Sequence, residues 1–405
     1  MEKQESKQSN LTDGRRRKVL RGIAAAGAAL SLPLGAPRVL AQARPPFRIG
    51  VLNTFSKLQS LGIGNLNGMS LYFEEIGWQA GGRKIEIVKE DDEVNPQVGL
   101  QKLRKLVESD KVDLVSGPQV SNVAMSIIDY VRSSKTMVMV HAGVTGISYM
   151  KIPYLFRTST TTWQTCHPMG EWLYDNVAKE CVVLASDFAG GRDVVKEFKA
   201  AYVAKGGKII KEIYPPLNTN DYSAYLTDVR SIAPPVTFNF FIGSDAVRYV
   251  KQYDELGLKG KIKLTGFAVI DNDTMPAQGK SALGGITAWC WTDTLDNPEN
   301  RKFVAAYRAK YNAWPDVYSE YGYTAAKVIA ETLNATRGDS TDKDRFAAAM
   351  LAVKFNGPRG PFSFDPATKN VIQNVYIREA VEMEGRMTNK VIATYRDVRL
   401  PAVPS

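Results

Sequence analysis

The sequence predicts an α/β protein of two lobes, each a parallel sheet flanked by helices. Short β-rich apolar runs alternate with segments of helical periodicity from Phe47 onward, as in parallel strands joined by crossover helices. This plan is completed once near Arg157 and begins again at Cys181. The chain has 405 residues, and the roughly 360 that follow residue 43 are more than one hydrophobic core usually holds, so two Rossmann-like lobes are expected.

The first lobe is expected to span most of the chain up to residue 166. It opens with an apolar strand at 47–52 and a helix at 64–77, whose apolar positions recur at helical spacing. Residues 84–88 alternate apolar and polar side chains, which predicts a strand, and Pro96 favours a helix start. The other predicted elements are a helix at 96–109, strands at 112–115, 137–140 and 154–157, and a helix at 123–133.

The second lobe repeats the architecture without a residue-level repeat. Strands are predicted at 181–185, 208–213, 238–242, 262–264 and 286–291, with helices at 194–205, 222–232 and 246–256, the last ended by Gly257. Helices at 298–311, 319–336 and 341–352 and β-segments at 374–379 and 390–394 follow. These late elements have no unit of their own, so we expect them to return to the two lobes through a multi-strand hinge.

The expected lobes are 44–166 with 293–371, and 167–292 with 372–405. Several crossings between them imply a cleft, and open α/β sheets bind ligands beyond the carboxyl ends of their strands.

The N-terminus predicts an export signal over residues 1–43. Arg15-Arg16-Arg17 precedes an uncharged small-apolar run at 22–37 and the small-x-small sequence Ala41-Gln42-Ala43, so cleavage is expected after Ala43. The paired arginines favour a twin-arginine signal over an ordinary secretory one. The run is too short to span a bilayer. Without the signal the net charge is (52−8)−(42−3), or +5, with no basic stripe typical of nucleic-acid binding.

The sequence offers no catalytic constellation, so we expect neither an enzyme nor a cofactor. The histidines, His141 and His167, have no partner motif, and no glycine loop completes a dinucleotide or phosphate-binding pattern. Cys166, Cys181 and Cys290 lack metal-ligand spacing; reduced thiols are expected, with a Cys166–Cys181 bridge as the alternative. An exported hydrolase is the weaker alternative.

Two loops after strands suit a carboxylate. Residues 117–122 and 141–145 are rich in Gly and small hydroxyl residues and lead into predicted helices, whose free N–H groups favour anions. Aromatic residues lie at strand ends or near the expected hinge, at Trp163, Phe188, Tyr318, Tyr321 and Tyr323, the last of which is expected in the core.

These segments resemble the Leu/Ile/Val-binding, type I periplasmic-binding family of ABC-importer solute-binding proteins. The resemblance runs from Phe47 to Glu379 and rests on the order and spacing of short motifs: Ile49-Gly50-Val51-Leu52, Glu90-Asp91-Asp92, Val115-Ser116-Gly117-Pro118, Ala142-Gly143-Val144-Thr145, Phe156-Arg157-Thr158, Ser186-Asp187-Phe188-Ala189, Asn220-Asp221-Tyr222-Ser223 and Gly360-Pro361-Phe362-Ser363-Phe364-Asp365.

The resemblance implies a monomeric periplasmic receptor that delivers a small ligand to a permease and an ATPase. It implies that Ser121, Val144 and Thr145 hold a carboxylate while Phe188 and Tyr318 pack on an apolar body; further expected pocket positions are Trp163, Ser244, Ala268 and Tyr321.

The ligand expected from the resemblance is an aromatic or aliphatic acid. Members that bind amino acids use an acid after the strand ending near Leu264, whereas here no acid occurs until Asp271. Gly190 stands where members that bind aromatic acids carry a bulky residue, so a larger pocket is expected. The alternatives are a branched-chain amino acid, amide or urea ligand, or a sensing partner of a membrane receptor.

Overall fold

A computed structural model describes residues 44–401 of the chain. The export signal expected over residues 1–43 lies outside the described residues. Between residues 44 and 401, no helix combines the length and the apolar character that crossing a membrane requires.

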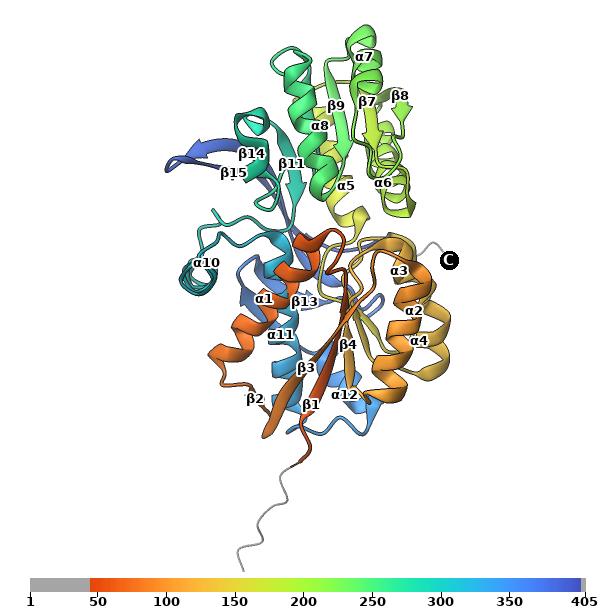
Figure 1. Cartoon of the computed structure of the whole chain (residues 1–405), viewed down its shortest axis with the longest axis vertical. Helices are drawn as coiled ribbons and strands as arrows, with labels where there is room; N and C mark the ends of the chain where they lie inside the picture. Colours follow the sequence, from red (N-terminus) through yellow and green to blue (C-terminus); the bar gives the residue numbers. More distant parts are fainter. Residues whose placement is uncertain (1–43, 402–405) are drawn as a thin grey trace, which may run out of the picture. The chain divides into compact units, whose positions relative to one another are not determined.

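The first lobe is built on a six-stranded sheet. Its strands are β1 (Phe47–Asn53), β2 (Gln79–Ala80), β3 (Arg83–Asp91), β4 (Leu114–Ser116), β5 (Val138–Val140) and β6 (Leu155–Arg157), and its early helices are α1 (Gln59–Glu75), α2 (Pro96–Arg104), α3 (Ser121–Ser126) and α4 (Ile128–Ser134), with short turns η1 (Lys105–Ser109) and η2 (Thr145–Tyr149). The strand order is β2-β3-β1-β4-β5-β6, parallel except for β2. Helices α2, α3 and α4 cover one face (Figure 1), where their apolar side chains pack on β1 and β4.

The second lobe is built on a mixed nine-stranded sheet. Its parallel part has the order β11-β10-β9-β7-β8, formed by β7 (Glu180–Ala185), β8 (Lys208–Ile213), β9 (Val236–Phe240), β10 (Lys263–Phe267) and β11 (Ile286–Trp289). The associated helices are α5 (Thr162–Asn176), α6 (Ala189–Ala204), α7 (Ser223–Ile232), α8 (Gly243–Glu255), α9 (Met275–Gln278) and the turn η3 (Gly279–Ala282).

The remaining elements return to both lobes. They are the helices α10 (Pro298–Tyr311), α11 (Val317–Ala335) and α12 (Lys343–Leu351) and the antiparallel strands β12 (Lys354–Gly357), β13 (Gly360–Phe364), β14 (Val371–Met383) and β15 (Arg386–Val398). Strand β14 joins the second sheet beside β11, and the residue before it, Asn370, bridges to Arg157 at the end of β6. The C-terminal segment therefore links the two sheets, as the sequence predicted.

A buried arginine ties the crossing segments together. Arg359 forms an ion pair with Glu320 of α11 and donates to the Thr158 carbonyl (2.8 Å) and to Gln373 Oε1 of β14 (2.7 Å). Because Arg359 and Glu320 are both fully buried, loss of either partner would leave an uncompensated charge in the hinge.

Two glycines permit the close packing of α1 against α11. A Cβ atom at Gly68 would lie 1.7 Å from the Ser319 carbonyl oxygen, and one at Gly322 would lie 1.9 Å from the Asn65 carbonyl oxygen. Only glycine allows the two backbones to approach this closely. Helix α11 is thereby held against α1 on the face of the first sheet opposite α2 (Figure 1).

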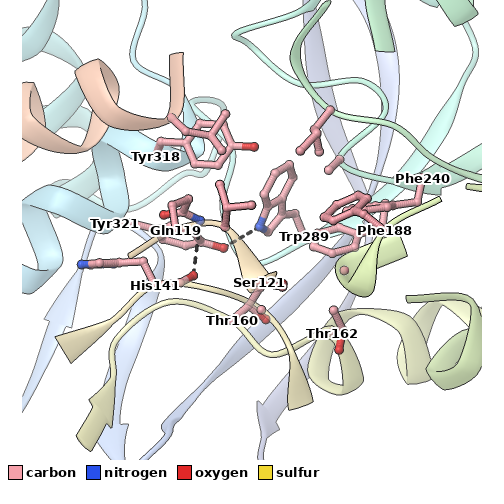
Figure 2. Close-up of a pocket in the computed structure, with 17 residues that line it drawn as sticks. Gln119, Ser121, His141, Thr160, Thr162, Phe188, Phe240, Trp289, Tyr318 and Tyr321 are labelled. Carbon is pink, nitrogen blue, oxygen red and sulfur yellow. Dashed lines mark hydrogen bonds between the residues drawn. The ribbon is translucent and has the colours of Figure 1, made fainter. Parts of the chain in front are cut away.

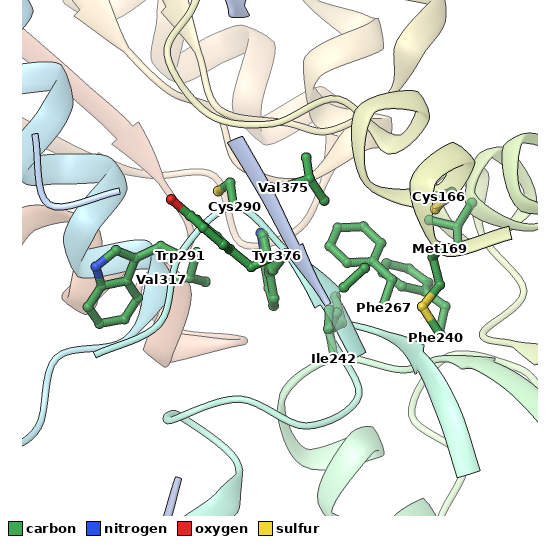
Figure 3. Close-up of a cluster of buried hydrophobic side chains, with 14 of the residues drawn as sticks. Cys166, Met169, Phe240, Ile242, Phe267, Cys290, Trp291, Val317, Val375 and Tyr376 are labelled. Atoms are coloured by element: carbon green, nitrogen blue, oxygen red, sulfur yellow. The ribbon is translucent and has the colours of Figure 1, made fainter. Parts of the chain in front are cut away.

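One apolar cluster continues from the second lobe into the hinge. Figure 3 shows Cys166 and Met169 of α5 near Phe240 and Phe267, and Cys290 and Trp291 near Tyr376. The three cysteines are buried and unpaired, as the preferred sequence interpretation expected. The lobe boundary predicted after residue 166 falls inside helix α5. The division of the chain into the two predicted lobes stays a prediction.

The structure differs from the sequence prediction mainly at element ends. The hairpin of β12 and β13 was not predicted, because Gly357, Pro358 and Gly360 interrupt its short apolar pattern. Strands β14 and β15 extend well beyond the predicted 374–379 and 390–394, since their mutual pairing carries polar residues into the ladder. Helix α6 begins at Ala189 rather than at residue 194. The segment 186–191, which was expected to be a loop, therefore already contains the first residues of the helix.

Candidate functional site

A cavity lies where the carboxyl ends of strands from both sheets meet. It holds about 550 Å³ of empty space, including the part open to solvent. Residues that follow or end β4, β5, β6, β7, β9, β10 and β11 line it together with α1 and α11: Leu61, Gln119, Val120, Ser121, His141, Gly143, Thr160, Thr162, Phe188, Gly190, Phe240, Ile242, Phe267, Ala268, Trp289, Tyr318 and Tyr321. This is the position expected for the ligand of an open α/β sheet.

Small polar groups of the first lobe form one side of the cavity. Figure 2 shows Gln119, Ser121 and Thr160 on this side. Gln119 Nε2 donates to the His141 carbonyl (3.3 Å), and Thr160 Oγ1 lies 3.1 Å from Thr165 Oγ1. Ser121 is a buried residue whose hydroxyl has no hydrogen-bond partner within the described part of the chain, so the hydroxyl is available to a ligand.

Aromatic rings of the second lobe and α11 form the other side. Phe188 stacks on Phe240 with ring centroids 6.1 Å apart, and Phe240 stacks on Phe267 at 5.3 Å. Trp289 meets Tyr318 edge to face at 5.8 Å. These rings offer an apolar surface to a planar ligand.

Among residues 44–401, those that line the cavity include no Asp, Glu, Lys or Arg. His141 is its one titratable group that could carry charge near neutral pH, and burial, together with the charges of Arg359 and Arg157, lowers the pKa of His141 to about 3. Its ring turns away from the cavity (Figure 2), with Nε2 2.8 Å from Ser116 Oγ. The cavity wall is therefore uncharged at neutral pH.

A buried cation lies behind the first-lobe side. The Arg157 guanidinium contacts Ser148 Oγ (2.5 Å), Asn370 Oδ1 (2.8 Å) and the Val144 carbonyl (3.0 Å), and no carboxylate of residues 44–401 lies within 4 Å of it. Burial lowers the pKa of Arg157 to about 10, so it stays charged at neutral pH, and the charge of Asp193 acts on it from farther away.

Two contacts join the lobes at the edge of the cavity. Asp193 of α6 accepts hydrogen bonds from the Thr145 N–H (2.9 Å) and the Thr162 hydroxyl. Ser60 of α1 donates to Asp273 Oδ2 in the loop after β10 (3.1 Å). The lobes therefore touch through polar groups on both sides of the cavity.

Five of the nine predicted site residues line the cavity: Ser121, Phe188, Ala268, Tyr318 and Tyr321. The other four do not. The Val144 carbonyl binds Arg157, Thr145 binds Asp193 and Thr162, the Trp163 ring stacks on His167, and Ser244 is exposed at the start of α8. Contact of any of the nine with a ligand stays a prediction.

Several lining residues were not predicted from the sequence. Phe240, Phe267 and Trp289 end strands of the second sheet, so a search of every strand end would have found them. Thr160 and Thr162 belong to a hydroxyl-rich run after β6, where Thr161 caps α5 through a reciprocal pair with Gln164.

Asp271 is paired with a residue outside the cavity lining. It forms a buried ion pair with Arg378 of β14, with Nη1 to Oδ1 at 2.8 Å. The described residues therefore place no carboxylate in the cavity wall that could hold an α-ammonium group.

The family model described as "Periplasmic binding protein" matches residues 46–385. The chain belongs to this family. The Leu/Ile/Val-binding protein homolog 6 of Brucella melitensis is 30% identical over 360 residues, which cover 86% of this chain and 91% of that protein. The predicted family and fold class are confirmed.

Solved structures of ABC-transporter solute-binding proteins share the fold of this periplasmic binding protein. One from Rhodopseudomonas palustris BisB5, in complex with 3,4-dihydroxybenzoic acid, is 31% identical with a TM-score of 0.84. Another from R. palustris, in complex with benzoate, is 30% identical with a TM-score of 0.81. Each match covers 87% of this chain and 98% of the other. The chain is a substrate-binding protein of the ABC-transporter type; such proteins bind small ligands and work with permease and ATPase components.

Proposed function

We propose that this periplasmic binding protein closes on a small aromatic carboxylic acid and delivers it to its transporter. The observation that carries the proposal is the uncharged cavity, in which the Ser121 hydroxyl, without a partner among residues 44–401, faces a wall of aromatic rings. A planar acid satisfies both sides, because its ring packs on Phe188 and Trp289 while its carboxylate accepts from Ser121 and neighbouring donors.

The charges of the site favour an acid over an α-amino acid. An ammonium group in this cavity would have no carboxylate partner, since Asp271 is paired with Arg378 and Asp273 does not line the cavity. Burying an unpaired cation is costly. A carboxylate is favoured by the unpaired charge of Arg157 behind the first-lobe wall.

Two relatives at 30–31% identity carry benzoate or 3,4-dihydroxybenzoic acid in their structures. They support the same ligand class here. We further propose that the chain is exported through the twin-arginine signal and cleaved after Ala43, and that it acts as a monomer.

Isothermal titration calorimetry of residues 44–405 with benzoate, 4-hydroxybenzoate and leucine tests the proposed ligand. We expect both aromatic acids to bind and leucine to give no heat. Tight leucine binding without any response to the two acids would overturn the proposal. Mass spectrometry of the ligand that copurifies with the protein gives an independent identification.

A further inference from the structure

The Tyr321 hydroxyl has both of its acceptor positions filled. Trp289 Nε1–H donates to it at 2.6 Å (Figure 2), and the Cys290 thiol donates at 3.6 Å. Burial raises the pKa of the Cys290 thiol to about 11, which keeps it protonated and able to donate. A hydroxyl has two lone pairs and one hydrogen, so Tyr321 can take a further partner only as a donor.

The hydrogen of Tyr321 has no oxygen or nitrogen acceptor in the part of the chain that the structure describes; the Cys290 sulfur is only a weak acceptor. Tyr321 lines the cavity and its side chain is buried. A buried O–H without an acceptor is unusual in a folded protein. A ligand in the cavity can supply the missing acceptor.

Two buried arginines lie near the Tyr321 side chain, of which Arg359 is ion-paired with Glu320. The Arg359 guanidinium lies over the Tyr321 ring, 5.0 Å from its centroid, and the charge of Arg157 also interacts with Tyr321. Burial raises the pKa of Tyr321 well above its usual value, so the phenol keeps its hydrogen. Donation from Trp289 polarises the O–H bond and strengthens it as a donor.

We propose that the Tyr321 hydroxyl, oriented by Trp289 and Cys290, donates to the carboxylate of the bound ligand and selects an anion over a neutral group of the same shape. The inference rests on the proposed function. It assigns the anion to a donor on α11, in place of the Thr145 N–H, which already binds Asp193.

Tyr321→Phe removes the donor and keeps the ring. We expect the affinity for benzoate to fall about tenfold to a hundredfold, the loss usual for a hydrogen bond to a charged acceptor. Benzamide is the neutral probe of the same shape, and its weaker hydrogen bond should suffer less. The ratio of benzoate to benzamide affinity should therefore fall at least about fivefold.

Tyr323→Phe is the matched control, since its hydroxyl contacts Glu75 outside the cavity (3.2 Å). It should leave both affinities unchanged. Thermal unfolding of each variant checks that it folds.

An unchanged affinity ratio in Tyr321→Phe would overturn the role of Tyr321 while leaving the proposed function intact, even if both affinities fell together. A wild-type protein that binds no aromatic acid would overturn both.

Discussion

Gly190 sets the position of the Phe188 ring, and replacing it with alanine should reduce ligand affinity without weakening the fold. A Cβ atom at Gly190 would lie 2.6 Å from Phe188 Cε2, 2.9 Å from Cζ and 3.2 Å from Ser121 Oγ. Carbon atoms normally approach to about 3.5–4.0 Å, so the ring must move by about 1 Å.

The displaced ring is a wall of the cavity, stacked on Phe240. Overpacking of this kind costs about 1–3 kcal/mol. In the empty protein the Phe188 ring avoids this cost by moving into the cavity, but a bound ligand prevents that movement. The cost therefore appears as a loss of affinity of about fivefold to 150-fold. Gly190 lies in the first turn of α6 without a positive φ, so alanine should hold or raise stability, by up to about 1 kcal/mol.

Calorimetry with benzoate and thermal unfolding without ligand measure the two effects separately. Gly146→Ala is the control, because a Cβ atom there meets no atom within 4 Å. If Gly190→Ala bound benzoate as tightly as the wild type, Phe188 would not form part of the wall around the ligand. If it lost stability and affinity in parallel, the effect would be global.

Three further predictions concern single side chains of the site. Ser121→Ala should weaken an acid by about 1–3 kcal/mol in calorimetry, because it leaves an acceptor unpaired in a closed cavity; an unchanged Kd would remove Ser121 from the site. The pKa of His141 is about 3 in the folded protein and 6.5 in the unfolded chain. Below pH 6.5 the unfolded chain therefore binds a proton at His141 that the folded protein does not bind, and the free energy of unfolding decreases as the pH is lowered. Relative to His141→Gln, the wild type should lose about 2 kcal/mol between pH 7.5 and pH 5 in denaturant titrations, and parallel curves would contradict the assignment. Asp193→Ala removes a contact between the lobes and should speed benzoate release about tenfold in stopped-flow measurements, while Asp187→Ala, which breaks only an exposed pair with Arg192, should not; equal release rates would mean that the Asp193 contact does not hold the closed form.

Prediction from the sequence succeeded where a local pattern fixes the outcome. The alternation of apolar strands and amphipathic helices gave both lobes, because parallel strands need crossover helices and each apolar run must be buried. Element ends were less accurate, as at α6, where Gly190 and Gly191 concealed a helix start that packing enforces.

The site was predicted only in part, because side-chain direction depends on packing. Thr145 follows a strand end, as expected, yet its N–H binds Asp193 from the other lobe. Trp163 is aromatic and close to the cleft in sequence, but α5 turns its ring onto His167. Trp289 could have been found at a strand end, whereas its hydrogen bond to Tyr321 joins residues 32 positions apart and leaves no sequence signal.

The sequence by itself determined the family, the two α/β lobes and the absence of an acid suited to an amino-acid ligand before Asp271. These features depend on the order of local segments, which one chain displays directly. Only the tertiary structure decided that the cavity wall is uncharged, that Asp271 is paired with Arg378, and that Trp289 and Cys290 leave Tyr321 a donor. These facts arise from contacts between distant segments, where burial and partner geometry set the charge and hydrogen-bonding state of each group.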